Sequence, residues 1–141
     1  MTTSTLSTIE QSIHKTNKWI EELGQELHCE SNHAYKALRA VLHTLRARMT
    51  IQEASDLGAQ LPMLVRGIYY EGFNPSAQPT KESDKHSFLE SVGRELVGAS
   101  EADAEQATKS VFRLLSVHCT AGQIAHVKSQ LPKEVQALWP T

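Results

Sequence analysis

The amino-acid sequence predicts an all-α protein, a compact bundle of about eight helices that forms a single domain over residues 1–141. Apolar residues recur at spacings of three and four along most of the chain, which is typical of amphipathic helices. Helix-start signals such as Thr50-Ile51-Gln52-Glu53 precede several of these runs. No segment has the alternation of a half-buried strand. A chain of 141 residues can bury about 70% of its unfolded surface, so it needs no metal or disulfide to fold.

The first two helices are predicted from their caps and apolar faces. We interpret Ser7-Thr8-Ile9-Glu10 as a capping box that opens the first helix, and Ser31 or Asn32 as the cap of the second. The predicted core face of the first helix is Ile9, Ile13, Ile20, Leu23 and Leu27. The predicted core face of the second helix is Ala34, Ala37, Leu38, Val41, Leu42 and Leu45.

Two shorter helices are predicted to follow. Thr50 caps the third helix, which continues to Leu61. Pro62 suits the first turn of a fourth helix, where a missing N–H is no loss, and Gly72 is a natural stop. The next residues, 73–80, are rich in turn formers and are predicted to form a linker or an ordered loop.

An internal repeat relates the two halves of the sequence. A shift of 70 positions aligns Gln60-Leu61-Pro62 with Gln130-Leu131-Pro132. At the same shift, nine of 36 residues are identical between 34–69 and 104–139. The alternative is chance similarity between amphipathic helices. We expect an internal duplication, because repeats of this length mark structural units.

The second half therefore carries the same signals as the first. Ser100 and Thr120 are predicted helix caps. The duplication predicts two pseudo-symmetric four-helix units at residues 5–72 and 84–140, joined by a loop at residues 73–83. The predicted core residues of the second unit are Phe88, Leu89, Val92, Leu96, Val111, Phe112, Leu114 and Leu115.

Composition and charge argue against several classes of protein. The net charge is -2, so no global field attracts nucleic acid or an anionic membrane. The N-terminal residues lack the pattern of a secretory signal, and no apolar run approaches the ~18 residues of a membrane span. Cys29 and Cys119 do not make a disulfide framework. We expect a cytoplasmic protein with free thiols and no cofactor, either a monomer or a homodimer.

Residues 61–73 carry a family resemblance. They read Leu-Pro-Met-Leu-Val-Arg-Gly-Ile-Tyr-Tyr-Glu-Gly-Phe. This run, together with residues 34–42 and Phe88-Leu89, resembles the bacterial family catalogued as domain of unknown function 2267. Phe73 stands where that family pattern leads us to expect Trp. The resemblance covers nearly the whole chain and implies a bacterial, helical, cytoplasmic protein, but it implies no activity.

The strongest candidate site is the polar and aromatic end of the predicted fourth helix. A guanidinium, two phenols and a carboxylate could hold a polar ligand or a partner peptide there. Packing and loop anchoring are the alternative role for the same side chains. The second half replaces Arg66 with Gln136, so the fold does not require that arginine twice. The candidate residues are Arg66, Tyr69, Tyr70, Glu71 and Phe73.

A basic stripe on the predicted second helix is the next candidate. Lys36, Arg39, His43 and Arg46 recur at spacings of three and four, so they share a helical face. Arg39 and His43 are added to the binding candidates. The stripe could bind phosphate or an acidic partner. The alternative is a solvated face that pairs with the first-helix residues Glu21, Glu22, Glu26 and Glu30.

The sequence carries little that indicates chemistry at a metal or a nucleophile. His28-Cys29 and His118-Cys119 contain ligand types for zinc, but they lack a common zinc spacing. Adjacent residues on a helix point apart, so His118 does not automatically activate Cys119. We therefore predict no metal ligands and name no catalytic residues.

The function predicted is a non-catalytic interaction or regulatory module. It would bind a protein partner or a small ligand through the aromatic and polar end of the first unit. A small enzyme is one alternative, using Arg66, Tyr70 and Glu71, or His118 and Cys119. Weak nucleic-acid binding through the basic stripe is another, which the overall charge disfavours.

Overall fold

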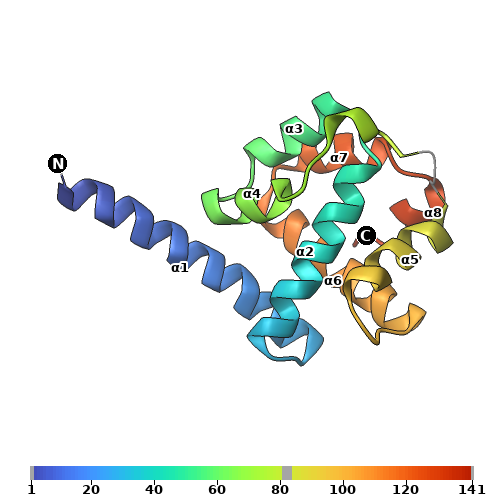
Figure 1. Ribbon diagram of the computed structural model, residues 1–141, viewed down its shortest axis with the longest axis horizontal. Helices are drawn as coiled ribbons and strands as arrows, with labels where there is room; N and C mark the ends of the chain where they lie inside the picture. Colours follow the sequence, from blue (N-terminus) through green and yellow to red (C-terminus); the bar gives the residue numbers. More distant parts are fainter. Residues whose placement is uncertain (1, 81–83, 141) are drawn as a thin grey trace.

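The computed structural model describes residues 2–80 and 84–140, with side chains described for 7–80 and 84–140. Eight α-helices and one 3₁₀ helix make up the secondary structure of these residues, which contain no strand (Figure 1). The all-α prediction is therefore confirmed. The helices are α1 (Thr2–Leu27), α2 (Ser31–Ala47), α3 (Ile51–Ala59), α4 (Met63–Tyr70), α5 (Lys85–Glu95), α6 (Glu101–His118), α7 (Ala121–Ser129) and α8 (Lys133–Gln136), and the 3₁₀ helix is η1 (Pro75–Ala77).

Helices α2 and α6 form the centre of the bundle. The second half of α1 packs on both of them, and α5 packs on both as well. Helices α3 and α7 pack against each other, while α4 lies against α1, α2 and α3 (Figure 1). No helix in the described residues combines the length and apolar character that a membrane crossing requires.

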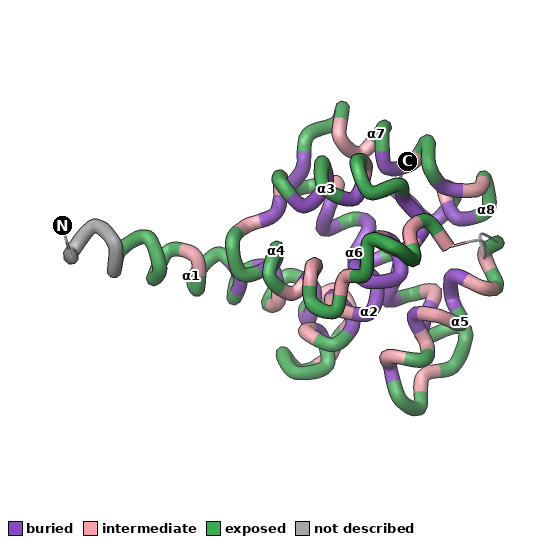
Figure 2. The backbone as a smooth tube through the Cα atoms, turned by 45° about the horizontal axis from the view of Figure 1, so that its top comes forward, coloured by how far each residue is buried: buried purple, intermediate pink, exposed green. Residues whose placement is uncertain are grey.

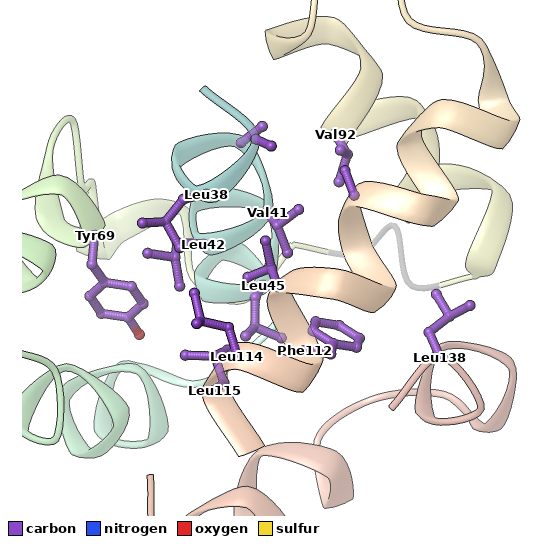
Figure 3. Packing of buried hydrophobic residues seen from close by; sticks show 14 of the residues in the cluster. Leu38, Val41, Leu42, Leu45, Tyr69, Val92, Phe112, Leu114, Leu115 and Leu138 are labelled. Carbon is purple, nitrogen blue, oxygen red and sulfur yellow. The ribbon is translucent and has the colours of Figure 1, made fainter. Parts of the chain in front are cut away.

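The core is built from the apolar faces of α2 and α6. Apolar residues at three- and four-residue spacing lie on one side of each helix, so those sides meet in the interior. Each large aliphatic side chain that is fully buried contributes about 1.5–3 kcal/mol. The buried residues labelled in Figure 3 are Leu38, Val41, Leu42, Leu45, Tyr69, Val92, Phe112, Leu114, Leu115 and Leu138.

Helix starts follow the predicted caps in three places. The Thr50 hydroxyl accepts the amide of Glu53 at 3.2 Å, and the Thr120 hydroxyl accepts the amide of Gln123 at 3.2 Å. Ser100 and Asp103 form a reciprocal capping box. These side chains satisfy amides that have no partner in the first turn of a helix.

The predicted caps of the first two helices are wrong. Helix α2 begins at Ser31 and has Glu30 as its N-cap, so Ser31 and Asn32 lie inside the helix. Helix α1 begins at Thr2, so Ser7 and Glu10 lie inside it. A Ser and a Glu three residues apart also fit an exposed helix face, which is where both lie. The spacing alone could not distinguish a helix start from a helix interior.

The segment after α4 is an ordered loop anchored to the end of α2. It contains η1, and the amide of Thr80 donates to the carbonyl of Ala47 at 2.8 Å. The Gln78 side-chain amide donates to the carbonyls of Arg46 and Met49. The loop predicted at 73–83 is therefore present over its described part, and residues 81–83 lie outside the described residues.

The first half of α1 extends away from the other helices (Figures 1 and 2). Ile9 and Ile13 lie there, each 47% exposed, whereas Trp19 and Leu23 further along are buried. The predicted core face of this helix therefore reaches the core only through its second half.

Candidate functional site

The aromatic residues predicted as a site join α4 to α3. Tyr69 is fully buried, and its hydroxyl donates to the carbonyl of Ala54 at 2.7 Å. The Tyr70 ring meets the edges of Tyr69 and Phe73, with ring centres 5.0 and 5.6 Å apart. Gly58 leaves the space that the Tyr70 ring occupies, because a Cβ there would lie 2.6 Å from the Tyr70 hydroxyl. Burial raises the pKa of Tyr69, so its phenol stays protonated and serves as a donor.

Arg66 is held by the end of α3. Its Nε donates to the carbonyl of Gly58 at 2.9 Å, and its Nη2 donates to the carbonyls of Ala59 and Leu61 at 3.3 and 2.9 Å. The carbonyls of Gly58 and Ala59 belong to the last turn of α3, where a cation is favourable, and that of Leu61 belongs to the turn that follows. Arg66 therefore does not join the Glu71 carboxylate, which contacts a different helix.

Four charged or titratable side chains form what we call the ionic junction: Arg39, His43, Glu71 and Glu95. Arg39 binds Glu71 at 2.6 Å and Glu95 at 2.7 Å. The hydrogen bond that Arg39 donates to the Glu71 carboxylate raises the pKa of Arg39. His43 Nδ1 lies 3.3 Å from Glu95, and its Nε2 lies 2.7 Å from the carbonyl of Ile68. Both ring nitrogens of His43 therefore face an oxygen atom of another helix or of a helix end.

Arg46 extends this junction to the loop after α4. Its Nη1 donates to the carbonyls of Tyr69 and Glu71, and its guanidinium lies 5.4 Å from the centre of the Phe73 ring. Burial lowers the pKa of Arg46. The side chain thus fixes the end of α4 onto α2.

The predicted pairing of the basic stripe with first-helix glutamates is wrong. Arg39 and His43 contact Glu71 and Glu95 instead, because this side of α2 faces α5 and the end of α4. His43 is only 9% exposed, so the stripe is not a solvated face along its length. On α1, Glu22 contacts His118 and Glu26 contacts Arg113, both on α6.

The His118-Cys119 pair has no nucleophile geometry. His118 stacks on Trp19, with ring centres 4.6 Å apart, and its Nε2 lies 2.9 Å from the Glu22 carboxylate. Burial raises the pKa of Cys119 to about 11, so its thiol is protonated at neutral pH. Cys29 and Cys119 are both free thiols. Within the described part of the chain, no group of three or more His, Cys, Asp or Glu side chains could hold a metal ion.

A groove that the sequence did not indicate lies beside Arg66. Its volume is about 520 Å³, and it runs between α1, the α3–α4 turn at residues 60–62 and the end of α6. We call it the α1–α4 groove. Its lining includes Lys15, Lys18, Trp19, Met63, Arg66 and His118.

The α1–α4 groove is positively charged and partly apolar. Lys15 and Lys18 are exposed on its α1 wall, and Arg66 lies on the opposite wall. None of the described residues that line the groove is an Asp or a Glu. Its apolar surface comes from Trp19, from Met63 and from the turn that precedes Met63. A ligand in this groove would therefore meet cations and apolar groups together.

Two other surface hollows lack this concentration of positive charge. The hollow between α5 and α6, of about 350 Å³, includes His86, Glu90, Arg94 and Glu101, which pair with one another at 3.2–3.4 Å. The hollow at the α1–α2 turn, of about 750 Å³, is lined by acidic Glu21 and Glu30, and its described lining residues include no Lys or Arg. Of these three hollows, the α1–α4 groove is therefore the best candidate for binding a negatively charged ligand.

The structure separates the predicted site residues into three groups. The ionic junction contains Arg39, His43 and Glu71. The aromatic contact is formed by Tyr69, Tyr70 and Phe73. Of the predicted residues, Arg66 alone lines the groove. Sequence reasoning missed Glu95, Lys15, Lys18 and Trp19. The three α1 residues share one helical side, but nothing local indicates that the α3–α4 turn lies opposite them.

Comparison with known proteins gives a family and no activity. A search of curated proteins finds no significant match. A family model described as an uncharacterized conserved protein matches residues 16–138, which include α2 to α8 and the described groove residues except Lys15. The chain therefore belongs to the DUF2267 family.

Proposed function

We propose that this protein is a non-catalytic helical interaction module that binds a partner in the α1–α4 groove. The observation that carries the proposal is the charge of the groove. Lys15, Lys18 and Arg66 line it without a carboxylate among its described lining residues, although the whole chain has a net charge of -2. Such a local concentration of one sign favours binding of the opposite sign.

The contacts elsewhere support this choice of surface. The polar groups of Tyr69 and Glu71 are already bound within the chain, to Ala54 and Arg39. These contacts anchor α4, so the presence of Tyr69 and Glu71 is explained without a ligand. Arg39 and His43 are likewise engaged in the ionic junction, so the basic stripe offers few free cations to nucleic acid. The raised pKa of Cys119 argues against thiol catalysis.

We also infer that the two halves of the chain arose by duplication. Helices α3 and α7 span residues that differ by 70, and both are capped by a threonine. Arg66 and Gln136 each donate to a leucine carbonyl five residues earlier. A shift of 69 places Asp84 and Ser87 opposite Lys15 and Lys18. The cations of the groove therefore belong to the first half alone, as expected for a specialised surface on a repeated fold.

The setting that fits this proposal is the cytoplasm of a bacterium, as the family resemblance implies. The test is charge reversal in the groove, with Lys15→Glu and Lys18→Glu in one variant. Native mass spectrometry and crosslinking of the gently purified protein would detect the partner and map its contacts. We expect crosslinks at the groove in the wild-type protein and loss of the complex in the variant.

A matched control keeps this test specific. Lys36 on α2 and Lys133 on α8 are exposed and lie outside the groove lining, so Lys36→Glu with Lys133→Glu changes the net charge equally. The control should retain the complex. Equal loss in both variants would show that only net charge matters, and crosslinks confined to the aromatic end of α4 would move the site there.

A further inference from the structure

We infer that the occupant of the α1–α4 groove is an acidic peptide segment that also carries an apolar side chain. The inference rests on the proposed function and names the chemistry of the partner. It follows from three features of the groove: the positions of its cations, its apolar surface, and the acidic residues that border it.

The cations stand on two facing walls. Lys15 and Lys18 are three residues apart on α1, so they are neighbours on one side of the helix. Arg66 lies across the groove, with its guanidinium already fixed by the carbonyls of Gly58 and Leu61. A chain lying between these walls can present carboxylates to both. Because Arg66 is held in place, its charge is preorganised for such a ligand.

The apolar surface of the groove favours a ligand that carries an apolar group in addition to its negative charge. Met63 is 56% exposed at the groove, and its sulfur lies 3.9 Å from the Ser12 hydroxyl. Methionine adapts to apolar partners of different shapes, and it is common on surfaces that bind peptides. Leu61 and Pro62 adjoin it in the lining. Inorganic phosphate would leave these groups uncovered, whereas a peptide side chain would cover them.

Acidic residues close to the groove limit the length of an anionic ligand. Glu22 contacts His118 at the α6 side, and Glu26 contacts Arg113 one turn further along α1. A long polyanion such as single-stranded RNA would pass these carboxylates and would find no continuous row of cations. A short acidic segment fits within the positively charged stretch.

Three short peptides test the inference with the full-length protein. All are acetylated and amidated: one has a central Leu-Phe flanked by Asp and Glu, one replaces every acid by its amide, and one keeps the acids but replaces Leu-Phe by Ser-Ser. Binding is measured by calorimetry and by chemical-shift changes in the isotope-labelled protein. We expect the acidic Leu-Phe peptide to bind at least about tenfold more tightly than the amide peptide and about fivefold more tightly than the Ser-Ser peptide.

Variants of the protein show where the acidic Leu-Phe peptide binds. Lys15→Glu with Lys18→Glu should weaken binding of the acidic Leu-Phe peptide by at least about tenfold. The control pair Lys36→Glu with Lys133→Glu should stay within about twofold of wild type. Shifts should concentrate at Lys15, Trp19 and Met63. Thermal melts of both variants check that the fold is retained.

Several results would overturn the inference. Equal binding of the acidic and amide peptides would remove the role of charge, and tighter binding of pyrophosphate or of an RNA oligonucleotide would name another ligand. If no peptide binds while crosslinked partner capture still depends on Lys15 and Lys18, the partner class is wrong and the proposed function stands. If capture also survives the charge reversal, both proposals fail.

Discussion

Single residues in this protein act mainly as anchors between helices. Arg66, Arg46 and Gln78 each use a charged or amide group to bind backbone carbonyls near the end of a helix. Each such contact satisfies acceptors that the last turn of a helix leaves open. Cys119 differs, because it is a buried titratable group whose environment offers no charge partner. Its titration can be followed in the folded protein.

The Cys119 thiol should make stability depend on alkaline pH. Burial raises its pKa from 9.0 to about 11 in the folded state, so the folded protein holds its proton more tightly than the unfolded chain. The resulting stability is complete below about pH 9 and is lost as the pH rises toward 11. Urea unfolding should show the wild-type free energy falling in this window by up to about 2–3 kcal/mol relative to Cys119→Ala. Parallel pH curves for the two proteins would contradict this.

At the scale of elements, α3 and α4 are joined by a close contact. Gly58 on α3 lets the Tyr70 ring of α4 approach, and Arg66 binds the carbonyls that follow. On the other side of α4, the ionic junction and Arg46 hold its end to α2. Helix α4 is short, so these contacts rather than its own hydrogen bonds determine its position.

Gly58→Ala should therefore destabilise the protein although alanine favours helices. The new Cβ would lie 2.6–2.9 Å from Tyr70 ring and hydroxyl atoms, and displacing that ring should cost about 1 kcal/mol or more net. Gly67→Ala is the matched control, since nothing lies within 4 Å of its added Cβ, and it should gain about 0.5–1 kcal/mol. Denaturant unfolding measures both. Adding Tyr70→Leu to Gly58→Ala should cost less than the two single changes summed; simple additivity would show that the ring is not displaced.

At the scale of the whole molecule, local signals in the sequence predict the helices but not their neighbours. Thr50, Ser100 and Thr120 act within three residues, so their caps could be predicted from spacing. The Arg39–Glu95 contact joins residues 56 apart, and no local pattern indicates it.

The groove depends on the same kind of long-range arrangement. It brings residues 15 and 18 next to residue 66 and residue 118, from three helices. The sequence singled out Arg66 because the proposed repeat aligns it with Gln136, which is a comparison between the two halves rather than a local spacing. The lysines gave no such signal, because exposed lysines are common on helices.

The overall shape leaves one apolar stripe uncovered. Ile9 lies seven residues before Thr16, and Ile13 lies seven residues before Ile20, so all four share one side of α1. Other helices cover this side at Thr16 and Ile20, and the same side continues uncovered into the extended half of the helix. Both isoleucines are 47% exposed. If they remain exposed in solution, they contribute little to folding.

Ile9→Gln with Ile13→Gln should lower the free energy of unfolding by less than about 1 kcal/mol, because neither side chain loses a buried site. Leu23→Ala on the buried half of the same helix should cost about 2–5 kcal/mol. Urea titrations at several protein concentrations, with sedimentation equilibrium, measure both stability and mass. A larger loss in the double variant that grows with protein concentration would mean that a second copy covers the stripe in the wild type. The extended half of α1 would then be part of a dimer interface, since only association makes stability depend on concentration.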